Sequence, residues 1–303
     1  MNLAGRVLVL RADATASVGA GHAMRLAVLG DTWVKAGGAV RLCGRLEIPF
    51  VVDRYRRLGI VPEDRDAAEG DVLVVDTYES GARFRATQAA GVGVRLLVDD
   101  FGVDVAPGFD AVWNPNGPGD HAIYRHFGGA IFSGADYLAV REDLPRWRGG
   151  SGEVAVSLGG GRPPTMVLDA FERLAEMFPE QPFSATGNWA PPRWRRISAD
   201  RLWDDVVGAK QLLTAAGTTV WEAAAVGIPV GLLMIADNQR LVYRWARDAG
   251  APGINTTLLD AEFLAHQLRS LIGVACALPR VENGTPRLIE GLMALVGTRP
   301  VRR

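Results

Sequence analysis

Short apolar runs alternate with longer amphipathic stretches along almost the whole chain. This alternation is typical of βαβ units, in which helices join the parallel strands of one sheet. In the first half we expect strands at Val7–Leu10, Val40–Cys43, Val72–Val75, Val94–Val98 and Ala111–Trp113. The intervening helices are expected to begin near His22, Pro49 and Ser80.

The alternation of apolar runs and amphipathic stretches is interrupted once, near the middle of the chain. Residues 146–152 are polar and rich in glycine without any periodicity, so we interpret them as a linker. Strands are then expected at Val154–Leu158, Gln211–Thr214 and Pro229–Leu233. Helices are expected at Thr165–Phe178, Thr218–Val226, Asn238–Ala249, Ala261–Leu271 and Pro286–Leu295, of which the last two would close the second half.

The chain of 303 residues is long enough for two domains, which we expect at residues 1–148 and 149–303. Each is predicted to be an α/β domain with a Rossmann-like, doubly wound parallel sheet. Ligands bind such sheets beyond the carboxyl ends of the strands, where loops and helix N-termini lie. We therefore expect the two domains to face a cleft that holds the functional site.

Charge and composition exclude several classes of partner. Lys and Arg number 33 against 34 Asp and Glu, which gives a net charge of -1. Without a basic excess or a polybasic run, neither nucleic acid nor a membrane surface is expected as a partner. The first apolar run leads straight into Arg11 and Asp13, unlike a signal peptide, and no stretch approaches the ~20 apolar residues of a membrane span. We expect a cytoplasmic protein, and its oligomeric state stays open.

The loop after the first expected strand contains the strongest candidate for catalysis. Gly19 and Gly21 allow a tight turn and close approach of a ligand, and His22 follows at the start of a helix. A helix N-terminus disfavours imidazolium, so His22 is a candidate general base. A lone histidine at a helix start more often packs or caps, but the glycines and the strand–loop–helix context favour a function. The dinucleotide-binding fingerprint is not met, because a third glycine is missing and the loop is too long.

Loops of the second half suggest a site for a phosphate and a ribose. Gly159 and Gly160 end a strand ahead of a helix, and residues 217–219 do the same one unit later. Free backbone N–H groups at such positions can bind a diphosphate. Glu222, one turn into the next helix, is placed to accept hydrogen bonds from ribose hydroxyls. Each feature alone is common in α/β proteins, and only their combination favours a nucleotide site.

Together these residues resemble the GT-B superfamily and, within it, the UDP-sugar hydrolases of the pseudaminic acid pathway (UDP-2,4-diacetamido-2,4,6-trideoxy-β-L-altropyranose hydrolases). The resemblance covers roughly residues 6–255. In the first half the motifs are Arg11-Ala12-Asp13, Gly19-Ala20-Gly21-His22-Ala23-Met24-Arg25, Val75-Asp76-Thr77-Tyr78, Leu97-Val98-Asp99-Asp100 and Asn114-Pro115-Asn116. In the second half they are Ser157-Leu158-Gly159-Gly160, Ala215-Ala216-Gly217-Thr218-Thr219 with Glu222, and Asn238-Gln239.

The resemblance implies metal-independent, inverting attack of water on C1 of a nucleotide-activated amino-deoxy sugar, with release of UDP. It implies that His22 is the catalytic base and that no cofactor takes part. The residues it assigns to nucleotide binding are Gly159, Gly160, Gly217, Thr218, Thr219 and Glu222. Those it assigns to the rest of the substrate are Asp13, Gly19, Gly21, Arg25, Tyr78, Asn116, Asn238 and Gln239.

The chain departs from the family pattern at three places, and several alternatives stay open. Gly161-Arg162-Pro163 replaces a usual Ser-Asp-Pro, Lys210 replaces an acidic residue, and Trp189–Trp194 is an unusual insert. We interpret Asp99-Asp100 as a loop-start cap, with a role in positioning His22 or water as the alternative. We interpret Trp147, Trp189, Trp194 and Trp203 as core or linker packing, because they do not share one helical face.

Other functions also remain open. A glycosyltransferase would use the same base against an acceptor hydroxyl, and a sensor would bind the nucleotide-sugar without catalysis. No group of His, Cys, Asp and Glu has metal-ligand spacing, so no metal is expected.

Overall fold

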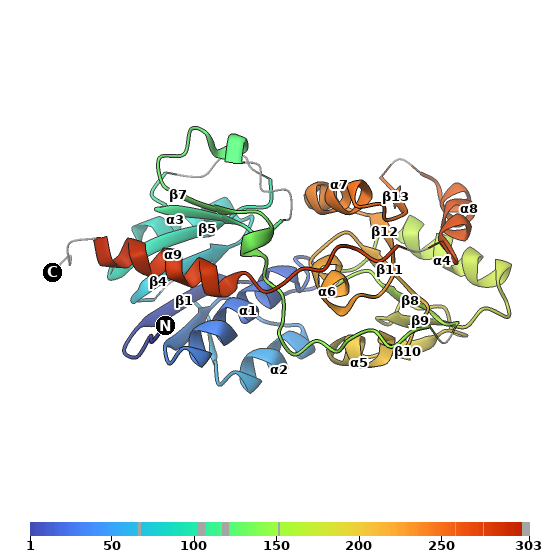
Figure 1. The fold of residues 1–303 in the computed structure, drawn as a ribbon, viewed down its shortest axis with the longest axis horizontal. Helices are drawn as coiled ribbons and strands as arrows, with labels where there is room; N and C mark the ends of the chain where they lie inside the picture. The colour runs from blue at the N-terminus through green and yellow to red at the C-terminus, as the bar shows by residue number, and fades with distance from the viewer. Residues whose placement is uncertain are drawn as a thin grey trace. The chain divides into compact units, whose positions relative to one another are not determined.

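The computed structural model describes residues 1–65, 68–101, 107–116, 121–150, 152–257, 259–274 and 276–298 (Figure 1). The chain forms two compact units. The first comprises Met1–Val140 with Glu282–Arg303, and the second comprises Arg141–Val281. Each unit is built around its own parallel sheet.

The first unit has a seven-stranded sheet in the order β3-β2-β1-β4-β5-β6-β7, and every pairing in it is parallel. The order reverses between β1 and β4, as expected for a doubly wound sheet. Its strands are β1 (Val7–Ala12), β2 (Ala39–Cys43), β3 (Pro62–Glu63), β4 (Gly70–Asp76), β5 (Val92–Val98), β6 (Ala111–Asn114) and β7 (Ala130–Ser133). The five predicted strands are confirmed. The short strands β3 and β7 were not predicted.

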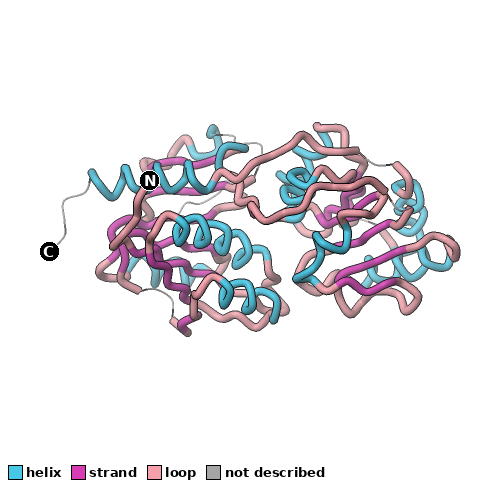
Figure 2. Tube along the Cα trace, turned by 60° about the horizontal axis from the view of Figure 1, so that its bottom comes forward, coloured by secondary structure: helices cyan, strands magenta, loops and turns pink. Residues whose placement is uncertain are grey.

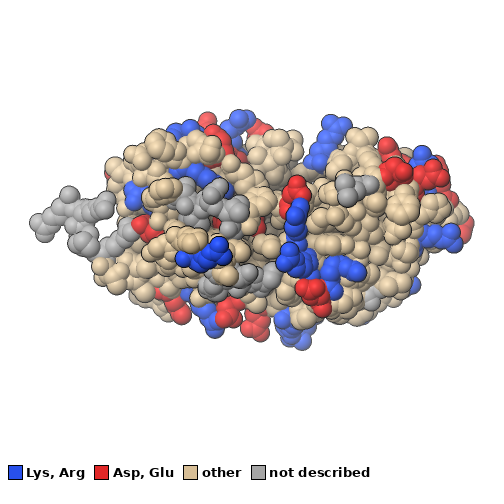
Figure 3. Space-filling model, turned by 90° about the horizontal axis from the view of Figure 1, so that it is seen from above, with Lys and Arg blue, Asp and Glu red and all other residues tan. Residues whose placement is uncertain are grey.

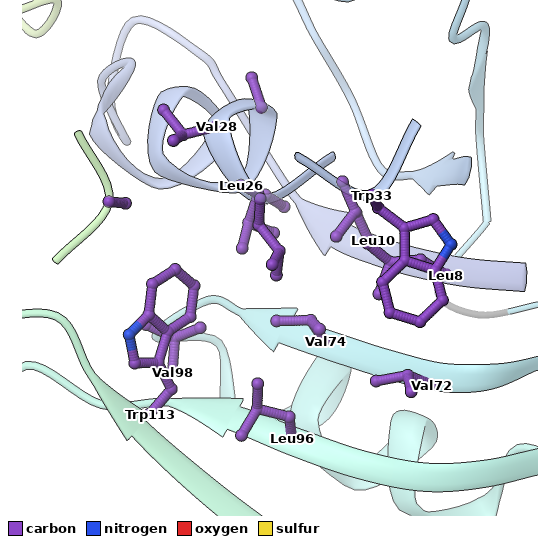
Figure 4. Packing of buried hydrophobic residues seen from close by; sticks show 14 of the residues in the cluster. Leu8, Leu10, Leu26, Val28, Trp33, Val72, Val74, Leu96, Val98 and Trp113 are labelled. Atoms are coloured by element: carbon purple, nitrogen blue, oxygen red, sulfur yellow. The ribbon is translucent and has the colours of Figure 1, made fainter. Parts of the chain in front are cut away.

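Helices cover both faces of this sheet, because side chains of a strand alternate between the faces. Leu8 and Leu10 pack with Leu26 and Trp33 of α1 (Gly21–Lys35) on one face (Figure 4). Val9, on the other face, belongs to a separate cluster that includes Ala86 of α3 (Ser80–Gln88). The remaining helical elements of the first half are α2 (Pro49–Arg57) and the 3₁₀ turns η1 (His121–Tyr124) and η2 (Ala135–Tyr137).

The last helix, α9 (Thr285–Thr298), packs on the first unit beside α1 (Figure 1). Its side chains Leu288, Ile289 and Leu292 are fully buried in the same cluster as Leu26. The hydroxyl groups of Thr285 and Thr32 lie 2.7 Å apart and tie the two helices together. The prediction that this helix closes the second half is therefore wrong. Its apolar stripe predicted a helix with one buried face, but a stripe does not specify which sheet it covers.

Leu288→Ala should consequently destabilise the first unit, although the residue lies near the end of the chain. Loss of a fully buried leucine side chain typically costs about 2–5 kcal/mol. Denaturant unfolding monitored by tryptophan fluorescence, to which Trp33 and Trp113 of the first unit contribute, tests this, with Glu290→Ala on the exposed face of α9 as the control. Equal midpoints for both variants would show that α9 adds nothing to the first unit.

The segment predicted to be a linker belongs to the second unit instead. The backbone N–H groups of Trp147 and Arg148 donate to the carbonyls of Val226 and Val207, at 2.9 and 3.0 Å. The indole N–H of Trp147 donates to the carbonyl of Ala209 at 2.9 Å. The units thus divide after Val140 and not at residue 148. Ser151, within the predicted linker, lies outside the described residues.

The second unit has a six-stranded parallel sheet in the order β10-β9-β8-β11-β12-β13. Figure 2 shows the strands of each unit in magenta, with helices in cyan beside them. The strands of the second unit are β8 (Val154–Ser157), β9 (Phe183–Thr186), β10 (Arg195–Ile197), β11 (Gln211–Ala215), β12 (Val230–Met234) and β13 (Gly253–Asn255). Its helical elements are α4 (Thr165–Met177), η3 (Ala199–Arg201), α5 (Leu202–Val206), α6 (Thr219–Val226), η4 (Asp237–Gln239), α7 (Arg240–Asp248) and α8 (Ala261–Leu271). The three predicted strands are confirmed, and the helix expected from Asn238 begins as the 3₁₀ turn η4.

The surface carries both charge signs. On the face seen in Figure 3, basic and acidic side chains are interspersed on each unit. Within the described residues, every helix is too short or too polar to cross a bilayer.

Candidate functional site

Five polar side chains of the first unit meet at the carboxyl edge of its sheet. Asp76 ends β4, Asp100 follows β5, and Asn116 follows β6, while His22 and Arg25 lie one turn apart at the start of α1. Strands β1, β4, β5 and β6 are neighbours and parallel, so their carboxyl ends share one edge. The fold thereby assembles residues far apart in sequence where α/β proteins bind ligands.

His22 pairs with a buried carboxylate. Its Nδ1 lies 2.5 Å from Oδ1 of Asp76, and the two residues are 6% and 1% exposed. An ionised carboxylate can only accept hydrogen bonds, so Nδ1 carries a proton and donates a hydrogen bond to Asp76. Nη2 of Arg25 approaches the same Nδ1 at 3.3 Å, but this contact is not a hydrogen bond, because both nitrogens are donors. With the proton on Nδ1, Nε2 is the ring nitrogen whose lone pair can accept a proton.

Arg25 joins two carboxylates with one guanidinium. Its Nε and Nη2 donate to the two oxygens of Asp76 at 2.5 and 2.7 Å. Its Nη1 and Nη2 donate to the two oxygens of Asp100 at 2.6 and 2.9 Å. Both contacts are bidentate, the strongest geometry for an arginine–carboxylate pair. Arg25 is only 6% exposed, so we expect it to organise the network, and its assignment to substrate binding stays a prediction.

The ionised states of this cluster follow from its contacts. Burial alone would raise the pKa of the Asp76 carboxyl, but Arg25 and His22 outweigh burial and hold the pKa well below its ordinary value. For Asp100, burial is likewise outweighed by Arg25, and the pKa is lowered. Burial alone would lower the pKa of Arg25, whereas Asp100 and Asp76 raise it well above its ordinary value. Both aspartates are therefore anionic and Arg25 is cationic at neutral pH.

Tyr78 and Asn116 complete the hydrogen bonding of Asp100. The Tyr78 hydroxyl donates to Oδ2 at 2.5 Å, and the Asn116 amide donates to Oδ1 at 3.1 Å. The Tyr78 ring also meets the His22 ring edge to face, with centroids 4.6 Å apart. His22, Arg25, Tyr78 and Asn116, all predicted as site residues, are thus brought together through Asp76 and Asp100.

The interpretation of Asp99-Asp100 as a cap holds for only one of the two. Oδ1 of Asp99 accepts from the backbone N–H of Phe101 at 3.0 Å, as a loop-start cap does. Its Oδ2 accepts from the Tyr124 hydroxyl at 3.0 Å. Asp100 instead belongs to the network of Arg25.

The remaining predicted residues of the first unit shape the loop ahead of α1. Gly19 has φ of +84°, a conformation that glycine adopts without strain, and Gly21 is the first residue of α1. Oδ1 of Asp13 accepts from the backbone N–H of Arg45 at 2.8 Å and pairs with Arg11 at 2.9 Å. Asp13 therefore ties this loop to the loop after β2.

In the second unit, the predicted nucleotide residues lie after β8 and β11. Gly159 has φ of +86°, and Gly160 follows it in the exposed turn before α4. Gly217 and Thr218 lead into α6, which begins at Thr219. No N-cap side chain binds the first backbone N–H groups of α4 or α6.

Two more predicted residues of the second unit make side-chain hydrogen bonds. Oε2 of Glu222 accepts from the indole of Trp203 at 2.7 Å. The side chain of Gln239 accepts from the backbone N–H of Ile235 at 2.9 Å and so braces the loop after β12. Its neighbour Asn238 lies in η4.

Within the described residues, no group of three or more His, Cys, Asp and Glu side chains is arranged to hold a metal ion. The buried carboxylates Asp76 and Asp100 pair with Arg25.

No protein-family model matches the chain, and no curated protein matches it in sequence. Solved structures do match it in fold. The UDP-GlcNAc 2-epimerase of Neisseria meningitidis has a TM-score of 0.62 at 9% identity, covering 95% of this chain and 99% of that one. The UDP-GlcNAc 2-epimerase of Methanocaldococcus jannaschii has a TM-score of 0.62 at 11% identity, with the same coverage. The calicheamicin glycosyltransferase CalG4 has a TM-score of 0.56 at 14% identity, covering 99% and 100%. The chain has the GT-B fold.

Asp76 and Asp100 were not among the predicted site residues. Both lie at the carboxyl ends of neighbouring strands, and this position could have identified them. A carboxylate at or just past the end of a buried parallel strand lies at the ligand-binding edge of the sheet. The partner of each carboxylate could not be read in the same way, because Arg25 is separated from them by 51 and 75 positions.

Proposed function

We propose that the protein is an enzyme that hydrolyses a nucleotide-activated sugar, with UDP as the nucleotide, at the anomeric carbon. The observation that carries this proposal is the buried Asp76–His22 pair at the carboxyl edge of the first sheet. A carboxylate that fixes the tautomer of a histidine leaves Nε2 as a general base. The solved structures that share the fold include UDP-GlcNAc 2-epimerases and a glycosyltransferase, which supports a nucleotide-sugar ligand.

In the proposed reaction, Nε2 of His22 accepts a proton from water as the water oxygen bonds to C1. The bond between C1 and the diphosphate oxygen breaks, and UDP leaves with the electron pair. Asp76 accepts a hydrogen bond from the resulting imidazolium and stabilises its charge. In the second unit, the first backbone N–H groups of α4 and α6 bind the diphosphate, as helix N-termini commonly do.

A second candidate is epimerisation of the sugar, with a product in which the sugar is attached to the nucleotide. The structural match to two UDP-GlcNAc 2-epimerases, each covering 95% of this chain, favours it. Acid–base chemistry on the sugar ring could use the same histidine. The two candidates differ in whether the bond between C1 and UDP is present in the product.

Incubation with a panel of UDP-sugars, without an acceptor, tests the proposal. We expect UDP and free sugar in equal amounts. Release of UDP only when an acceptor is added would indicate a transferase instead, and a UDP-sugar epimer would indicate the second candidate.

Hydrolysis in ¹⁸O-water identifies the bond that breaks. Attack on carbon places the label in the free sugar and none in UDP, and the anomer formed first has inverted configuration, because water and UDP lie on opposite faces of C1. Label in a phosphate, or a sugar 1-phosphate product, would contradict attack at C1.

A further inference from the structure

An indole donates to a carboxylate in the second unit. Trp203 lies on α5 and is 3% exposed, and its Nε1 donates to Oε2 of Glu222 at 2.7 Å. Glu222 lies in the first turn of α6 and is partly exposed. The indole is held in place by burial, so the carboxylate it binds is held as well.

The acceptor of the Trp203 indole differs in kind from the acceptors of Trp113 and Trp147. The indoles of Trp113 and Trp147 donate to backbone carbonyls, at 2.8 and 2.9 Å, and so join secondary-structure elements. Buried Nε1 of Trp194 has no hydrogen-bond partner in the described residues. Trp203 instead donates to a charged side chain that reaches solvent, which is unnecessary for packing alone.

A glutamate side chain has three rotatable bonds and loses conformational entropy when it is ordered. The hydrogen bond from Trp203 already restricts the Glu222 side chain in the free protein, so less conformational entropy is lost when a ligand binds. A carboxylate can accept about four hydrogen bonds, so accepting one from Trp203 is compatible with accepting others from ribose hydroxyls. The first turn of α6, which we propose to hold the diphosphate, carries this same residue, and in UDP the ribose adjoins the diphosphate.

We propose that Trp203 is a positioning residue that holds the Glu222 carboxylate ready to accept hydrogen bonds from the ribose hydroxyls. The inference rests on the proposed function. Trp203 itself does not touch the ligand, and acts through Glu222. The sequence indicated a packing role for Trp203, to which the structure adds the bond to Glu222.

The test compares two ligands by calorimetry: UDP, and 2′,3′-dideoxy-UDP, which lacks both ribose hydroxyls. Trp203→Phe retains an aromatic ring and loses the N–H. We expect its affinity for UDP to fall by about 5–10-fold, because the Glu222 side chain then has to be ordered when the ligand binds. Its affinity for 2′,3′-dideoxy-UDP should be unchanged. Glu222→Gln should show the same selective loss, and adding Trp203→Phe to it should have little further effect.

The matched control is Trp194→Phe, which alters a buried indole without removing a hydrogen bond from a side chain. It should leave the affinities for both ligands unchanged. If Trp203→Phe does not fold, 3-benzothienylalanine at position 203 replaces the indole N–H with sulfur at nearly the same shape and gives the same comparison.

Three outcomes overturn the inference while leaving the proposed function intact. These are an equal loss for both ligands in Trp203→Phe, an unchanged or tighter affinity for UDP, and a wild-type protein that binds both ligands equally. Failure of the wild-type protein to bind UDP would overturn the inference and the proposed function together.

Discussion

Replacing His22 with asparagine should lower the turnover of a hydrolysed UDP-sugar by about 10²–10⁴-fold, the usual contribution of a general base. The asparagine amide can still donate to Asp76, so the carboxylate keeps a partner while the basic nitrogen is lost. UDP affinity should change by no more than a few-fold, because the proposed nucleotide residues belong to the second unit.

The measurement is steady-state kinetics together with calorimetry on UDP. His266→Asn, at an exposed position of α8, is the control and should retain full activity. Full activity of His22→Asn would remove the proposed base. Loss of UDP binding in that variant would instead assign His22 to the nucleotide.

Arg25→Met should destabilise the first unit by about 3–5 kcal/mol at neutral pH, the typical result of removing one partner of a buried ionic group. The variant leaves Asp76 and Asp100 buried close together without the guanidinium that binds both. Denaturant unfolding gives the loss, and Arg244→Met, at an exposed position of α7, should change stability by less than about 0.5 kcal/mol.

The penalty of Arg25→Met should shrink on acidification. In the wild type, the pKa values of Asp76 and Asp100 are lowered, so their contribution is complete above the ordinary aspartate pKa of about 4 and is lost as pH falls below it. In the variant, the two buried carboxylates have lost the guanidinium between them and should have raised pKa values, so protonation relieves their repulsion as pH falls from 7 to 4. A penalty that is constant over this range would show that the network is not held by charge.

Most of the architecture could be predicted from the sequence, and for a physical reason. Strands of a parallel sheet are buried on both faces, so strands such as β1 and β4 stand out as continuous apolar runs between amphipathic helices. The position of His22 followed from the same pattern, since the loop after the first strand must reach the ligand-binding edge. Several short strands were missed, and two of them, Pro62–Glu63 and Arg195–Ile197, contain no apolar run.

The sequence by itself determined the two parallel-sheet units and placed His22 at the start of α1. Only the tertiary structure decided the partners: α9 on the first unit, Arg25 between Asp76 and Asp100, and Trp203 on Glu222. Hydrophobic periodicity records which face of an element is buried, because burial acts on each residue locally. Periodicity does not determine which other element packs against that face. Hydrogen bonds and ion pairs act over a few ångströms between residues far apart in the chain, so their pairing depends on how the whole fold brings those residues together.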